Sequence, residues 1–272
     1  MKPKFAFMLL LHAFCLAIPT LAYSDAPSFN VTSTTPVGSW VEREQRTVDH
    51  RNRETVSIIR QTMVESEQRD GELHYWIETE STNYKVKKKG VRKQQGDTAI
   101  VKVLVPASTL DGDPANLVNN LSGFGKEIIF QNGSQQPMRM REGGTMADLM
   151  LKALGVKVDY TFESLGRESV NIPAGEFRAE KFAGSGSVET RMLLKKITVE
   201  SQSEVWLTPD IPFGFARMVS NDLVNGKSQT SQAEVTQFGT SGGVSKIVGE
   251  PVDFMGEQTM PGINLKDLMP GG

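Results

Sequence analysis

The chain has 272 residues, with 30 Lys or Arg against 32 Asp or Glu, so its formal net charge is −2 at pH 7. A chain of this length can bury a sizeable hydrophobic core and has room for one or two domains. The slightly acidic balance argues against general nucleic-acid binding, which relies on basic surfaces.

The first 22 residues have the pattern of a secretory signal peptide. Lys2 and Lys4 precede an almost wholly apolar run over residues 5–18, and Ala22 supplies a small residue for cleavage. This run is shorter than the roughly 20 apolar residues that cross a bilayer, and an N-terminal membrane anchor is the alternative. We therefore expect an exported protein, periplasmic or secreted, with no transmembrane span in its mature chain.

The only cysteine, Cys15, lies within this leader, and the bulky Phe14 before it does not fit a lipoprotein signal. Removing residues 1–22 takes away two lysines and no acids, which leaves 28 cations against 32 anions and a net charge of −4. The mature chain then holds no thiol and two histidines, His50 and His74. Such a set excludes Cys-containing zinc sites, and we expect neither a metal nor a cofactor.

Composition divides the rest of the chain into three parts. Residues 23–37 are rich in Ser, Thr, Pro and Asn and are predicted to be an exposed leader. Residues 38–239 are predicted to form one folded domain. Residues 240–272 are Gly-rich, then contain Pro and Met without periodicity, which predicts a disordered tail.

The first part of the domain alternates between apolar and polar residues, as half-buried strands do. Asp70-Gly71 is a strong signal for a hairpin turn, and Lys89-Gly90 marks a second turn. The folded part is predicted to begin at residues 38–48, and strands are predicted over residues 54–66, 72–79, 83–93 (a pair around Lys89-Gly90) and 98–105.

Two helices are predicted to follow. The first begins at Asp113-Pro114 and continues to Leu121. The second begins with Thr145 as its cap and ends at Gly155, and its apolar residues recur at helical spacing. This stripe either joins an ordinary core or covers an apolar cavity, and a helix of this kind is expected over the open face of a sheet.

From residue 158 onward the pattern again predicts strands. Residues 166–182 and 203–219 each read as strand, turn and strand, with turn centres at Pro173–Gly175 and Pro212–Gly214. Gly184–Gly186 is predicted to be a flexible loop. Further strands are predicted over residues 192–199, 203–207, 216–220 and 231–238. The fold class is therefore mainly β (α+β), with a strongly curved antiparallel sheet or half-barrel and a few helices covering its concave face.

One basic cluster lies near the second hairpin. Its residues are Lys85, Lys87, Lys88, Lys89, Arg92 and Lys93. A hairpin tip that concentrates these charges could contact anionic lipid head groups or an acidic partner. The alternative is a solvated hairpin whose lysines prevent edge-to-edge strand pairing.

A catalytic reading has little support in the sequence. Residues 239–243 match the G-x-S-x-G pattern around Ser241. That motif needs a strand before the serine and a helix after it, and here a loop and the predicted tail follow. A hydrolase that uses Ser241 or acidic residues is the least favoured hypothesis, and we expect no enzyme activity.

The two turn segments carry a resemblance to known proteins. Val170–Ala179 (VNIPAGEFRA) resembles the "V-P-A-G-x-F" sequence motif of uncharacterised exported bacterial proteins. In those proteins a strand such as Val205–Pro209 and then "I-P-F-G", here Ile211–Gly214, come next. They resemble the LolA-like lipoprotein-carrier superfamily. Over residues 38–239, the resemblance implies a curved antiparallel sheet with helices in its concave face, and it transfers no catalytic or ligand residue.

The expected function is therefore binding of a lipid-like or other apolar ligand, such as a lipoprotein acyl chain, in the concave face. Its apolar wall is predicted to comprise Met138, Met140, Met146, Leu149, Met150 and Leu154. The alternative is an envelope protein–protein interaction scaffold that uses the hairpin at residues 85–93 or the C-terminal tail.

Overall fold

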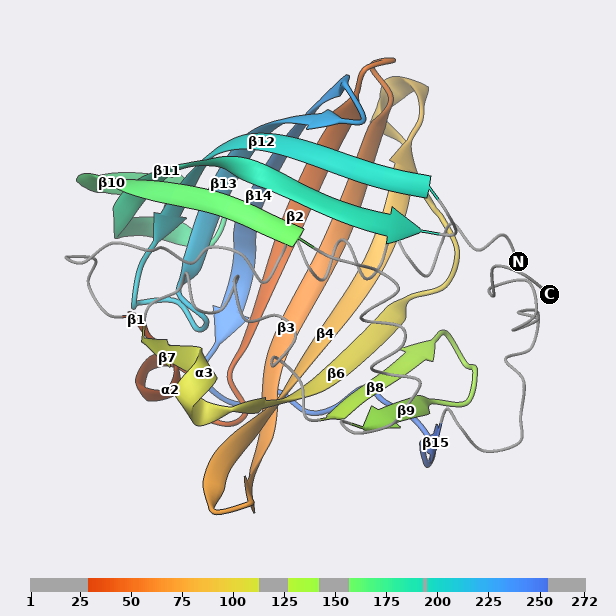
Figure 1. Cartoon of the computed structure of the whole chain (residues 1–272), viewed down its shortest axis with the longest axis vertical. Helices are drawn as coiled ribbons and strands as arrows, with labels where there is room; N and C mark the ends of the chain where they lie inside the picture. Colours follow the sequence, from red (N-terminus) through yellow and green to blue (C-terminus); the bar gives the residue numbers. More distant parts are fainter. Residues whose placement is uncertain (1–28, 113–126, 142–156, 193–194, 254–272) are drawn as a thin grey trace.

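The computed structural model describes residues 29–112, 127–141, 157–192 and 195–253. These residues form a 13-stranded sheet and a separate two-stranded sheet. The large sheet is open and strongly curved (Figure 1). The prediction of a mainly β protein with a curved sheet is confirmed.

The strands of the large sheet are β2 (Trp40–Asp49), β3 (Glu54–Arg69), β4 (Glu72–Val86), β5 (Arg92–Gln94), β6 (Ala99–Pro106), β8 (Glu127–Asn132), β9 (Met138–Arg141), β10 (Lys157–Ile172), β11 (Gly175–Met192), β12 (Lys195–Leu207), β13 (Phe215–Val224), β14 (Lys227–Gly239) and β15 (Val252–Asp253). Their order is β10-β11-β12-β13-β14-β2-β3-β4-β6-β8-β9-β15, with β5 paired to β4 beside this path. Strands β1 (Phe29–Asn30) and β7 (Asp111–Gly112) form the small sheet. All of these pairings are antiparallel except that of β15 with β9, which is parallel.

The sheet curls so that β10, β11 and β12 cross in front of β14, β2 and β3 (Figure 1). Strand β10 contacts β13 and β14, although β11 and β12 separate them in the strand order. The turn after β10 is tied to β14 by a hydrogen bond from Ala174 N to Val235 O of 3.2 Å. We call the surface inside this curl the inner face, and the largest core cluster, which includes Phe182, Val205 and Ala233, lies there.

Short helices close one end of the inner face. The described helices are α2 (Val31–Thr34), α3 (Ala107–Leu110) and the 3-10 helix η1 (Lys88–Gly90). Leu110 of α3 and Val31 of α2 pack with Met63, Ile77 and Val105. The two longer helices predicted from the sequence, at residues 113–121 and 145–154, fall in ranges that the structure does not describe. No described helix has the length and apolar character that a membrane crossing requires.

The predicted turns are confirmed. Asp70 and Gly71 join β3 to β4 with φ angles of 53° and 79°, and such positive values suit a tight hairpin turn. Pro173 and Ala174 lie between β10 and β11, and Gly175 begins β11. In the turn between β12 and β13, Gly214 N donates to Ile211 O at 2.9 Å.

The flexible loop predicted at Gly184–Gly186 is wrong, because these residues lie in the middle of β11. A Cβ atom at Gly184 would lie 2.6 Å from the ring of Phe162, and one at Gly186 would lie 2.6 Å from the Tyr160 ring. The glycines therefore let two aromatic rings from β10 lie across β11. Glycine marks close packing here and not a break in the strand.

The predicted disordered tail must be shortened at its start. Residues 240–253, which we call the strap, run along the face of the sheet opposite the inner face and end in β15 at its edge. Glu78, 2% exposed, accepts hydrogen bonds from Ser245 Oγ at 2.5 Å and Lys246 N at 2.7 Å. The side-chain amide of Gln131 donates to Val248 O and accepts from Val248 N, both at 2.9 Å. Residues 254–272 lie outside the described part of the chain.

Candidate functional site

A band of apolar side chains follows three neighbouring strands on the inner face. In the strand register, Val103 of β6 stands opposite Ile128 of β8, which stands opposite Met140 of β9. The next row places Val101, Phe130 and Met138 in the same way. We call these six residues the apolar band. All six are partly exposed.

The two faces of these strands differ in burial: the face opposite the apolar band is covered by the strap, whereas the band is partly exposed. Trp76, Leu104 and Ile129 point to the opposite face, where Ile247 of the strap packs against them. Met63 of the inner core stands opposite Ile77 on β4, which stands opposite Val103 on β6. Residues opposite each other in register point to the same face, so the apolar band lies on the same face as that core. Partly exposed apolar side chains on adjoining strands form a surface on which apolar ligands can be buried.

Two of the predicted wall residues, Met138 and Met140, lie in the apolar band. The other four, Met146, Leu149, Met150 and Leu154, lie outside the described residues. The sequence analysis did not identify the other members of the band, which are Val101, Val103, Ile128 and Phe130. Their signal was present in the alternation of residues 101–103 and in the apolar run of residues 128–130, but residues 127–132 were not recognised as a strand.

The predicted basic cluster is a hairpin that joins β4 to β5 through η1. Its lysines Lys85, Lys87, Lys88, Lys89 and Lys93 are exposed. Arg92 differs from them because both of its terminal nitrogens donate to the carboxylate of Glu44, each at 2.9 Å. Partial burial alone would raise the pKa of Glu44, but Arg92 and Arg46 hold that pKa below its usual value. Arg92 is thus a structural cation, and the lysines are the charges presented to solvent.

Polar side chains form a chain of hydrogen bonds across β10, β12 and β13 on the inner face. The Tyr160 hydroxyl is 2.8 Å from Ser203 Oγ and donates to Ser201 Oγ at 3.2 Å. Ser201 and Ser220 in turn donate to the two carboxylate oxygens of Asp222, at 2.7 and 3.1 Å. Burial raises the pKa of Asp222, although its hydrogen bonds partly oppose that shift. This network is internally satisfied and anchors β10 over its neighbours.

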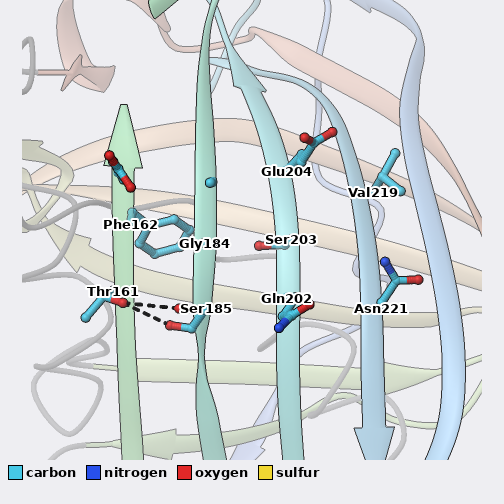
Figure 2. Close-up of a pocket in the computed structure, with 11 residues that line it drawn as sticks. Thr161, Phe162, Gly184, Ser185, Gln202, Ser203, Glu204, Val219 and Asn221 are labelled. Atoms are coloured by element: carbon cyan, nitrogen blue, oxygen red, sulfur yellow. Dashed lines mark hydrogen bonds between the residues drawn. The ribbon is translucent and has the colours of Figure 1, made fainter. Parts of the chain in front are cut away.

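The outer side of the same strands carries an open depression of about 670 Å³, shown in Figure 2. One row across β10 to β13 consists of Thr161, Ser185, Gln202 and Asn221. Thr161 Oγ1 donates to Ser185 O at 3.2 Å, and Glu204 pairs with Lys181 at 3.0 Å. The depression is also lined by Phe162, Glu163, Ala183, Gly184, Ser203 and Val219. Its hydroxyl and amide groups can form hydrogen bonds, and Glu163 and Glu204 add two carboxylates to the lining.

The remaining sequence candidates stay separate from these surfaces. Ser241 is exposed just after β14, in a segment that runs on as the strap without a following helix. His74 is 1% exposed, with Nδ1 3.0 Å from Glu72 O. Within the described residues, no group of three or more His, Cys, Asp or Glu is placed to hold a metal ion.

Comparison with known proteins gives limited similarity. No model of a known protein family matches the chain, and no curated protein matches its sequence. A candidate lipoprotein of Parabacteroides distasonis is 15% identical, with a TM-score of 0.34, over 76% of this chain and 98% of its own. A candidate exported protein with a YmcC-like fold from Bacteroides fragilis is 12% identical, also with a TM-score of 0.34, over 75% of this chain and 97% of its own. The LolA-like resemblance stays a prediction.

Proposed function

We propose that this protein is an exported, non-enzymatic binder of an apolar, acyl-chain-like ligand, and that the apolar band is the surface that holds it. The observation that supports the proposal is the position of six partly exposed apolar residues in register on β6, β8 and β9. A curved sheet presents such a band as the floor of a groove.

The energetics suit a long hydrocarbon chain. Each methylene group removed from water contributes about 0.8 kcal/mol, so about ten of them supply roughly 8 kcal/mol before the cost of association. The methionine side chains Met138 and Met140 are unbranched and adapt to ligands of varied shape. Selectivity by length or saturation would therefore be weak at this end of the band.

The first test is extraction of lipids from the purified protein followed by mass spectrometry. The second is titration with a fluorescent long-chain fatty acid, using the double variant Val103→Thr/Ile128→Thr. These substitutions keep the branched shape that suits a strand but place hydroxyl groups in the band. We expect affinity for the probe to fall at least about tenfold, because each buried hydroxyl costs about 1–3 kcal/mol.

The matched control is Val219→Thr/Leu223→Thr, which makes the same kind of change on β13, away from the band. Leu223 is 43% exposed, so this variant should keep the affinity of the unmodified chain. The proposal fails if no lipid co-purifies and the probe does not bind, or if both double variants bind it equally.

A further inference from the structure

Three hairpin tips meet at one end of the large sheet (Figure 1). They join β2 to β3, β4 to β5, and β13 to β14. Register fixes this arrangement, because Gln229 near the start of β14 stands opposite Asp49 at the end of β2, and Thr55 at the start of β3 stands opposite Lys85 on β4. Exposed cations are carried on all three tips, and we call this set the basic rim. Its members are Arg51, Lys85, Lys87, Lys88, Lys89, Lys93 and Lys227.

The charges of the basic rim are not neutralised locally. None of its seven members forms an ion pair with another residue in the described part of the chain. The nearby acids Asp49 and Glu44 already pair with other arginines. Asp49 accepts a hydrogen bond from Arg53 Nε at 2.7 Å, and Glu44 accepts one from Arg92 at 2.9 Å. Hydrogen bonds from Arg53 keep the pKa of Asp49 well below its usual range. Residues 81–96 contain no acid at all.

The central hairpin is held in a fixed shape. Lys89 and Gly90 have φ angles of 66° and 74°, as a tight turn requires. Lys87 N donates to Val91 O at 2.8 Å, and Gly90 N donates to Lys87 O at 3.1 Å. This turn leaves Val91 58% exposed among the lysines. An apolar side chain thus projects from the middle of a positively charged tip.

We propose that the basic rim docks the protein end-on to a bilayer that contains anionic lipids. Lysine ammonium groups are compact point charges that suit the diffuse negative potential of such a surface. Of the three arginines at these tips, Arg53 and Arg92 are used within the chain, so the rim presents six lysines and one arginine, Arg51. Val91 inserts among the head groups and adds apolar burial to the electrostatic attraction. A discrete acidic protein would favour arginine forks, so the bilayer is the partner that this chemistry fits better.

The test is co-sedimentation of the full chain, as cells process it, with vesicles of 30% phosphatidylglycerol in phosphatidylcholine at low salt. We expect Lys87→Gln/Lys88→Gln to weaken binding about 20- to 30-fold, because each lysine near an anionic surface contributes about fivefold. Val91→Asn alone should weaken it severalfold. Binding should also fall steeply as salt rises toward 0.5 M, where charges are screened.

The matched control is Arg178→Gln/Lys246→Gln, which removes two exposed cations that lie away from the rim. It should sediment like the unmodified chain, and neither form should bind vesicles of phosphatidylcholine alone. Equal loss in the two double variants, or no binding to the anionic vesicles, overturns the proposal. Rim-dependent retention on immobilised polyglutamate without vesicle binding would also overturn it and would indicate an acidic protein partner. Affinity of the fatty-acid probe for the apolar band is measured in a separate experiment. The proposed function can therefore fail while bilayer docking is supported, and bilayer docking can fail while the proposed function is supported.

Discussion

Gly184 and Gly186 show how single residues set the spacing of β10 and β11. Each occupies the place where a side chain would meet an aromatic ring from the neighbouring strand. Phe162, 6% exposed, gains its burial by lying over Gly184. The Tyr160 ring crosses at Gly186, and its hydroxyl reaches the serines of β12.

Replacement of Gly184 by alanine should therefore destabilise the protein. The new Cβ would lie 2.6 Å from the Phe162 ring and 2.8 Å from Ser203 Oγ, so the ring must move out of its packed position. We expect the free energy of unfolding in urea to fall by about 1–3 kcal/mol, as overpacking typically costs. Ser185→Ala, on the exposed position between the glycines, is the control and should change it by less than about 0.5 kcal/mol. Equal stability of Gly184→Ala and the original chain would contradict the close contact.

At the scale of elements, the strap covers the outer face of β4, β6 and β8, on which no second sheet packs in the described part of the chain. Its backbone is held by two buried side chains, Glu78 and Gln131, instead of a continuous strand ladder. Ile247 then covers Trp76, Leu104 and Ile129. The face opposite the apolar band is thereby buried without a second sheet.

Gln131→Leu should release the middle of the strap. The substitution removes both hydrogen bonds to Val248 while keeping a side chain of similar size, and two such bonds contribute about 1–3 kcal/mol. We expect amide exchange at Val248 to accelerate at least about tenfold in hydrogen-exchange measurements. Gln136→Leu, on an exposed position of the β8–β9 connection, should leave that rate unchanged. A Val248 amide that stays equally protected in Gln131→Leu would show that the strap is held by other contacts.

The elements that the sequence predicted well are those with local signals. Alternation and the Asp70-Gly71 turn located β3 and β4, and the Pro-Gly segments located the turns around β10 to β13. The strap was missed because its partners Glu78 and Gln131 are more than a hundred residues away, and the residues that dock there have no periodicity of their own. Four of the six residues of the apolar band were missed, and for Ile128 and Phe130 the reason is related, since only the register of β8 brings them beside the methionines.

The whole molecule is joined by the pairing of β14 with β2. Gly239 stands opposite Trp40 and Gln229 opposite Asp49, so residues about 190 positions apart along the chain form neighbouring strands. Strands β10 to β14 form one side of this seam, and β2 to β6 with β8, β9 and β15 form the other. A continuous ladder across the seam makes the sheet one structural unit.

We therefore expect the two sides to unfold together. In native-state hydrogen exchange with increasing urea, the protection of β12 and of β4 should disappear at the same denaturant concentration, because strands in one cooperative unit share one opening free energy. The interior amides of β3 serve as the internal reference, since they lie next to the seam. Loss of protection in β12 well before β4 would mean that the seam separates two units.

Strand β15 adds only Val252 and Asp253 beside Met138 and Arg139, yet it changes what the sheet can recruit. An open sheet can recruit further chains at both of its margins and so polymerise without limit. Because residues 252–253 of the strap already pair with part of the β9 edge, β10 is the longer edge left open among the described strands. Two copies that paired through β10 would cover each other's longer edge, so the short pairing of β15 with β9 reduces the edge at which further copies could add.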